Sequence, residues 1–208
     1  DTGVSHEIAY PAKADVTTNS KMAIGSYDHM VLVLENKLGI KHTEEFDTAI
    51  FGATGSGKKC WTIASTTAFA GQRSGVLQAS PSTPAMDCGD TPAPAYSYEI
   101  FDSMGEGGES PVFKAEDDGG FEMGSGAMRA KLLKSDLTTA TNFEDADRIL
   151  VAIQLESSKS ISEATTGFEI RFKMTDSVSV DLSYDGGSDR LYAVKNGADP
   201  FQIDLIVK

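Results

Sequence analysis

Histidine, cysteine and tryptophan are scarce in this sequence, and no long apolar run occurs in it. The chain has three histidines, two cysteines and a single tryptophan. The cysteines lack the C-x-x-C spacing, so the available ligands do not suit a structural zinc site. The longest apolar run, MVLVL at 30–34, falls far short of the ~20 residues that a membrane-spanning helix needs. We therefore expect no metal, no cofactor and no insertion into a membrane.

Basic residues are also in short supply. Lysine and arginine number 18 against 31 aspartates and glutamates, which gives a formal net charge of -13. Nucleic acids and anionic lipids are bound by clustered lysine and arginine, and no basic run occurs here. The composition therefore excludes nucleic acid as a partner and favours a solvated, acidic surface.

Signatures of catalysis are missing as well. No G-x-S-x-G nucleophile elbow occurs. Carboxylate pairs such as Glu44-Glu45 suit a glycosidase only if two of them face each other across a cleft, and nothing in the sequence places them so. Acidic clusters at 117–118, 144–147 and 185–189 offer oxygens to calcium, but without the spacing of an EF-hand. Surface charge explains all of them, and we expect the protein not to be an enzyme.

One stretch has the spacing of a phosphate-binding loop. Residues 52–59 (GATGSGKK) match G-x-x-x-x-G-K, in which backbone N–H groups surround the phosphates. The serine or threonine that should then bind magnesium is replaced by Lys59. The next residues, CWTIASTTAF, are β-branched and aromatic, which favours a strand over the helix that the motif requires. We interpret the stretch as a glycine-rich hairpin turn between strands at 46–51 and 60–69.

What the sequence does have is a two-residue periodicity over 148–208. Apolar residues recur at every second position, as in Phe168, Ile170 and Phe172 against Glu169 and Arg171. This period puts one kind of side chain on one face of a strand. The glycine-rich DGGSD at 185–189 has the length of a hairpin turn. The stretch predicts an antiparallel β-meander with one apolar face.

The remaining elements complete an all-β prediction. Residues 30–34 read as a strand covered on both faces, and 126–137 as the only convincing helix, with Met128, Leu132 and Leu133 at helical spacing. Proline and glycine cluster between 71 and 120, which indicates loops. We predict an antiparallel β-sandwich (Ig-like or jelly-roll-like) with one short helix and long Gly/Pro-rich loops. Residues 1–20 would be an extended strand and spacer, and 21–208 a single sandwich domain.

The two cysteines, Cys60 and Cys88, suit one disulfide in an exported protein. On the chain-entropy model, closing a loop of this size contributes about 3–4 kcal/mol of stability. The alternative is a pair of free, buried thiols. The chain also begins with Asp1 rather than methionine, which leads us to expect a processed protein that is secreted or displayed at the cell surface.

The N-terminal segment suggests a role in assembly. Val4, His6, Ile8 and Tyr10 alternate with other residues in a strand pattern, and a spacer follows from Pro11. An incomplete sandwich leaves an edge that an extended segment of a neighbour can complete. We therefore expect a secreted structural subunit that polymerises into a surface filament or pilus by donating this strand to another copy of itself. A strand that pairs within its own chain is the alternative for this segment.

A binding module is the second functional hypothesis. Exposed aromatic rings stack on sugar rings while polar neighbours bind the hydroxyls. The candidate platform residues would then read a surface polysaccharide, although packing in the core is the alternative role for each. A virion shell or decoration protein is a further structural reading of the same fold. The platform candidates are Trp61, Tyr96, Tyr98 and Tyr192.

Overall fold

The structure is a computed structural model that describes residues 22–65, 79–101, 121–123, 126–141, 143–173, 177–198 and 202–208. It is all-β, as predicted, and its strands pair antiparallel except for β12 and β3, which pair in parallel; in the described residues the only helical element is a short 3-10 turn, η1 (Phe143–Asp145). The strands are β1 (Gly25–Glu35), β2 (Leu38–Ile40), β3 (Thr43–Phe51), β4 (Ser56–Thr62), β5 (Met86–Gly89), β6 (Ser97–Glu99), β7 (Phe121–Met123), β8 (Gly126–Leu133), β9 (Arg148–Ile161), β10 (Phe168–Lys173), β11 (Val178–Asp185), β12 (Arg190–Ala198) and β13 (Gln202–Val207).

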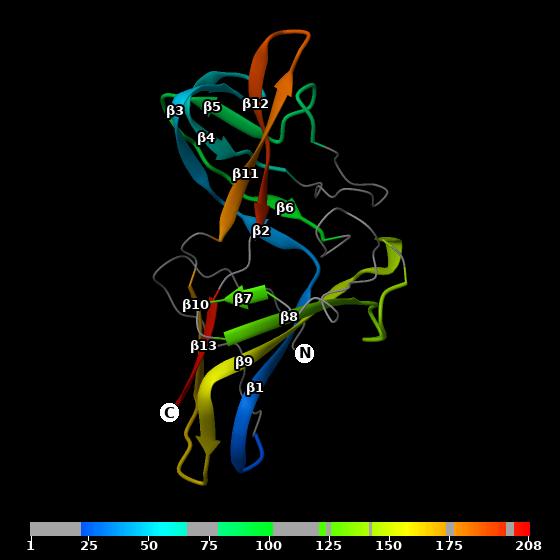
Figure 1. Ribbon diagram of the computed structural model, residues 1–208, viewed down its shortest axis with the longest axis vertical. Coiled ribbons are helices and arrows are strands. Elements are labelled where there is room, and N and C mark those ends of the chain that lie inside the picture. Colours follow the sequence, from blue (N-terminus) through cyan, green and yellow to red (C-terminus); the bar gives the residue numbers. More distant parts are fainter. Residues whose placement is uncertain are drawn as a thin grey trace.

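The strands gather in two groups along the long axis of the molecule (Figure 1). The lower group is a sandwich of a four-stranded sheet, ordered β1-β9-β8-β7, and the β10–β13 pair. The upper group is a five-stranded sheet, ordered β11-β12-β3-β4-β5. The β2–β6 pair lies between the two groups, so the chain passes through it on its way from β1 to β3.

The core of the lower group follows from the alternation along β9. Ile149, Val151, Ile153 and Leu155 occupy every second position, and all four are buried. They pack in one cluster with Leu205 of β13, which lies on the facing pair of strands. Because each buried aliphatic side chain contributes about 1.5–3 kcal/mol relative to exposure, this row is a main source of the stability of the lower group.

The upper group is closed by curvature and by a disulfide. The Ala85 N–H, just before β5, donates to the Val194 carbonyl of β12 at 2.6 Å, so the sheet curls until its β5 end meets β12. Cys60 of β4 lies directly opposite Cys88 of β5, and the two form a buried disulfide. The predicted pairing is confirmed, and it is typical of a chain that folds in an oxidising compartment.

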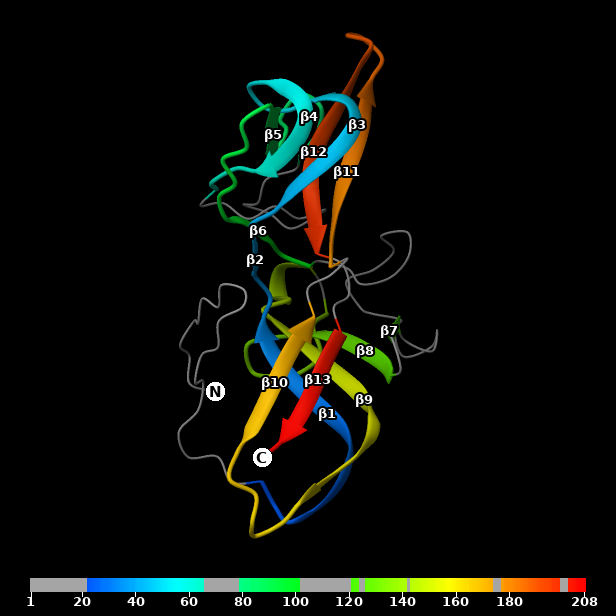
Figure 2. The same ribbon diagram turned by 90° about the vertical axis from the view of Figure 1, so that its left-hand side faces the viewer.

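The predicted meander over 148–208 is wrong in its connections. β9 pairs with β1 and β8 rather than with β10, and β10 pairs with β13. Strands β11 and β12 do form the expected hairpin, but in the upper sheet. The β10–β13 pair and the β11–β12 hairpin follow each other along the long axis (Figure 2). The chain therefore runs from the lower group into the upper group through β10 and β11 and returns through β12 and β13. The alternation gave the buried face of β9 correctly, but in β11 the register shifts after Asp181 and leaves Leu182 and Tyr184 exposed. It also does not specify partners.

The helix predicted at 126–137 is also wrong. Residues Gly126–Leu133 form strand β8, which pairs with β7 on one side and β9 on the other. Ala130 and Leu132, two positions apart, are both buried in the core that β9 and β13 share. The residues of this stretch favour a helix locally, but pairing on both sides and burial at a two-residue period outweigh that preference.

Strand β1 is not covered on both faces, contrary to the prediction for 30–34. Met30 and Leu32 pack into the lower core. Val31, at 58% exposure, and Val33 point to the other face and are exposed. β1 therefore alternates like a strand at the edge of a sheet, although its outward residues are apolar.

Polar side chains join the two groups. The buried Asn36, between β1 and β2, donates from Nδ2 to the carbonyls of Phe101 (2.6 Å) and Ala146 (2.7 Å), and its Oδ1 accepts from the Phe101 N–H (2.9 Å). Nearby, the Ser97 hydroxyl of β6 donates to Asn196 Oδ1 of β12 (2.8 Å). These bonds hold three distant stretches of the chain together at the junction between the groups.

Candidate functional site

Two strands of the lower group, β1 and β10, each have an edge with which no described strand pairs. In the described part of the chain β1 pairs with β9 alone, and β10 with β13 alone. Figure 2 shows β10 and β13 in front of the four-stranded sheet, with β1 crossing behind them. An unpaired edge presents backbone N–H and C=O groups to which a further strand can add. The region between the edges of β1 and β10 is called the open seam below.

The inner face of β10 is incompletely covered at this seam. Residues directly opposite in an antiparallel pair share a face, so Ile170 and Phe172 face the same way as their partners Leu205 and Ile203. Leu205 is buried at 6% exposure in the lower core. Ile170 is 37% exposed and Phe172 is 41% exposed, although both lie on that core-facing side. These two apolar side chains on the inner face of β10 are therefore only partly covered.

The edge of β1 carries few of the devices that discourage strand addition. Protein edges are usually blunted by proline, by inward charges, by bulges or by shortness. Residues 30–34 contain neither proline nor a charge, and the strand is 11 residues long. Its one register shift lies near the start, between Tyr27 and His29. The middle of β1 is thus an apolar edge without charge or proline.

The predicted donor residues Val4, His6, Ile8 and Tyr10 lie outside the described residues. The acceptor side is what the structure adds. Sequence reasoning missed it, because the pattern of Ile170 and Phe172 reads as an ordinary apolar face. Their exposure depends on the absence of a described strand on the outer side of β10. No local sequence pattern predicts that absence.

The four predicted platform residues do not form one surface. Trp61 is 9% exposed and lies against Gly89, so its ring is not open to a ligand and the platform role is wrong for it. Tyr96 and Tyr98 lie beside Gly39 of β2, with lysine ammonium groups over their rings. Tyr192 is separate from them, in the upper group, beside Phe51 with 5.6 Å between ring centroids. Tyr192 lines a cleft in the upper group.

The glycine-rich stretch 52–59 forms a hairpin turn at 52–55, as interpreted, but β4 begins at Ser56 rather than at residue 60; the turn already holds an anion. The Asp87 carboxylate accepts from the N–H groups of Thr54 (3.0 Å), Gly55 (2.9 Å) and Cys88 (2.9 Å), and from the Thr54 hydroxyl (2.6 Å). Partial burial raises the pKa of Asp87, but these four donors outweigh it and hold the pKa below its usual value. The amides that would surround a phosphate in a nucleotide site are thus bound by the protein's own carboxylate.

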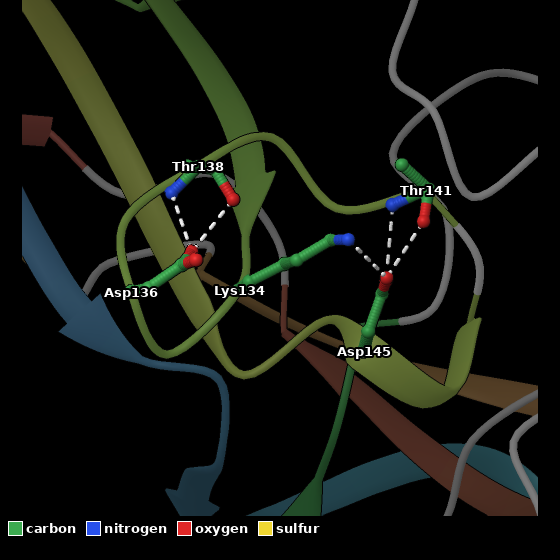
Figure 3. Close-up of polar contacts among 5 residues, drawn as sticks. All are labelled: Lys134, Asp136, Thr138, Thr141 and Asp145. Atoms are coloured by element: carbon green, nitrogen blue, oxygen red, sulfur yellow. Dashed lines mark hydrogen bonds and ion pairs between the residues drawn. The ribbon is translucent and has the colours of Figure 1, made fainter.

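The acidic turns hold themselves together in the same way. Figure 3 shows Asp136 accepting from the N–H (3.0 Å) and hydroxyl (2.6 Å) of Thr138. Asp145 likewise accepts from the N–H and hydroxyl of Thr141 and forms an ion pair with Lys134 at 3.1 Å. No cluster of three or more metal-ligating side chains occurs in the described residues. These carboxylates brace the turn between β8 and β9.

A cleft at the upper end of the molecule was not indicated by the sequence. Its walls come from the β3–β4 turn, from residues 81–84 and from the β11–β12 hairpin. These segments lie far apart in the chain, so only the fold brings them together.

Comparison with known proteins assigns no relationship. The chain matches no family model, no curated protein and no solved structure. None of the described helices is long and apolar enough to span a membrane. Function therefore has to be argued from the open seam and the cleft themselves.

Proposed function

We propose that this protein is a secreted structural subunit that assembles into a surface filament or pilus by strand donation between copies. The observation that carries the proposal is the open seam. Ile170 and Phe172 lie on the core-facing side of β10 yet are partly exposed, and β1 is an end strand of the facing sheet. The occupant is the N-terminal segment of a second copy, whose plugs are Val4, His6, Ile8 and Tyr10.

An added strand would satisfy both parts of the seam at once. Its backbone would bond to the free edge of β1, and alternate side chains would enter the space over β10. Three apolar side chains, those of Val4, Ile8 and Tyr10, would each contribute about 1.5–3 kcal/mol on burial. Ordering the segment opposes much of this gain. The net contact is therefore smaller than the gross gain, and each link of a filament would rest on one such contact.

Variants on each side of the contact test the proposal. Deleting residues 1–12 removes the donor, and Ile170→Lys places a charge in the acceptor at a site already 37% exposed. Both variants are expected to fold as monomers and to form no filaments by negative-stain microscopy and size-exclusion chromatography. The matched control is Leu137→Lys, since Leu137 is an exposed apolar residue in the β8–β9 turn, outside the seam. It should assemble like the unaltered chain.

Two results would contradict strand donation. One is filaments of normal length from the chain that lacks residues 1–12. The other is an unaltered chain that stays monomeric while its N-terminal segment is bound in its own seam, which is the intramolecular alternative. In that case deletion should expose Ile170 and lower the stability of the monomer.

A further inference from the structure

The cleft at the upper end of the molecule has the features of a ligand site that is independent of the open seam. It has a volume of about 820 Å³ and opens between the β3–β4 turn, residues 81–84 and the tip of the β11–β12 hairpin. The strands that form it lie at the far end of the long axis from β10 and β13 (Figure 1). A ligand held here would remain accessible when the seam is filled.

The floor of the cleft is fixed before any ligand arrives. The β3–β4 turn is held to β5 by the three hydrogen bonds that Thr54 and Gly55 donate to Asp87. A Cβ atom at Gly52 would approach the Cys88 nitrogen to 2.5 Å, so the turn lies flat against β5 and admits no side chain there. The disulfide between Cys60 and Cys88 locks β5 to β4 behind it. Preorganisation of this kind reduces the entropy lost on binding.

Aromatic rings form one wall. Phe51 and Tyr192 lie 5.6 Å apart and tilted by 41°. Tyr184 also lines the cleft and is 60% exposed. Exposed rings of this sort offer their faces to the C–H groups of a pyranose while a hydroxyl remains at the ring edge. The wall therefore suits a saccharide better than an extended peptide.

A single cation is placed over this wall. The Arg190 guanidinium lies 4.6 Å from the centroid of the Phe51 ring, which holds it in place through a cation–π contact. Arg190 is exposed and forms no ion pair with any described residue. Its cross-strand neighbour Asp185 has its oxygens bonded to the Gly187 N–H (3.0 Å) and the Ser188 hydroxyl (2.6 Å). The donors of Arg190 are thus available to a ligand.

We infer that this cleft binds a saccharide that carries a carboxylate. The planar guanidinium matches a carboxylate with two parallel hydrogen bonds. The sugar rings stack on Tyr184 and Tyr192, and the serine hydroxyls that line the cleft, at Ser56 and Ser82, bind its hydroxyl groups. Arg190 has to outweigh the net charge of -13 and the Asp185 carboxylate that also lines the cleft, since both repel an acidic sugar.

The test compares an acidic and a neutral trisaccharide on the full chain. The acidic probe is tri-galacturonate and the neutral probe is galactotriose. Saturation-transfer NMR detects contacts between the sugar and the protein, and calorimetry measures the affinity. Arg190→Gln should weaken tri-galacturonate binding about tenfold or more and leave galactotriose unchanged. Tyr184→Ser should weaken both. Arg171→Gln in β10, another exposed arginine, should change neither. Because the NMR signal is read on the ligand, the result does not depend on whether the chain assembles.

Several outcomes would overturn the inference. Absence of binding of tri-galacturonate at millimolar concentration would remove the site. Equal affinity for the two trisaccharides, or equal losses for Arg190→Gln and Arg171→Gln, would show that the guanidinium does not read a carboxylate. Because Arg190 is exposed, we expect the Arg190→Gln variant to fold normally, so that a loss of binding is not due to unfolding. Circular dichroism checks that the variant is folded.

Discussion

Replacing Asn36 by alanine should lower the free energy of unfolding by about 3–5 kcal/mol. The side chain makes three hydrogen bonds at the junction of the two groups of strands. Alanine leaves the carbonyls of Phe101 and Ala146 and the Phe101 N–H without these partners, in a site where Asn36 itself is buried. Each buried group left unsatisfied costs about 1–3 kcal/mol. Urea denaturation followed by circular dichroism measures the change.

Asn196 provides the matched control, because it is an equally buried asparagine with fewer bonds. Its Oδ1 accepts from Ser97, while its Nδ2 has no hydrogen-bond partner among the described residues. Asn196→Ala removes an unsatisfied donor along with one bond, so we expect it to be the milder variant by about 2 kcal/mol. Equal losses for Asn36→Ala and Asn196→Ala would show that packing volume, rather than hydrogen bonding, holds the junction.

Asp87→Asn should destabilise the upper group by about 1–2 kcal/mol at neutral pH. The carboxylate accepts four hydrogen bonds from Thr54, Gly55 and Cys88, and it is only partly buried, so water screens some of the effect. An amide keeps the acceptor but loses the charge and turns an N–H towards the Thr54 hydroxyl. Thermal unfolding at a series of pH values measures the loss.

The pH dependence has a definite sign. The pKa of Asp87 in the folded chain lies below its ordinary value of 3.8, so its contribution is fully present above that value. It is lost as the pH falls through the folded pKa. The difference between the unaltered chain and Asp87→Asn should therefore be constant from pH 7 to about pH 5 and narrow below about pH 4. A difference that grows on acidification would contradict this assignment. Asp136→Asn is the control for burial. Asp136 accepts the same kind of hydrogen bonds from a threonine, but it is fully exposed.

Local pattern predicted the buried face of β9 but not the partners of the strands. The alternation along 148–155 placed Ile149, Val151 and Ile153 on one apolar face, and all three are buried together. The same pattern says nothing of pairing, so the sequence could not show that β10 crosses to β13 and leaves β9 to β1 and β8. Partners are set by contacts between residues far apart in the chain, and these have no local signal.

The helix at 126–137 failed for a related reason. Short apolar stretches of leucine, alanine and methionine fit both a helical and a strand period. Ala130 and Leu132 are buried because β9 and β13 lie over them, which decides in favour of the strand. The cleft was equally hidden, since Phe51, Pro81 and Arg190 meet only through the curl of the upper sheet. By contrast the disulfide was predictable, because the chain has just two cysteines.

Mixing the two assembly variants tests strand donation most directly. The chain that lacks residues 1–12 keeps an intact acceptor, and Ile170→Lys keeps an intact donor. Neither should associate alone, but an equimolar mixture should form a one-to-one dimer and nothing larger, as measured by analytical ultracentrifugation. The dimer forms because the single donor of one variant fills the single open seam of the other. A mixture that stays monomeric, or one that forms filaments, would contradict the proposal that an extended strand of one copy completes the sandwich of the next.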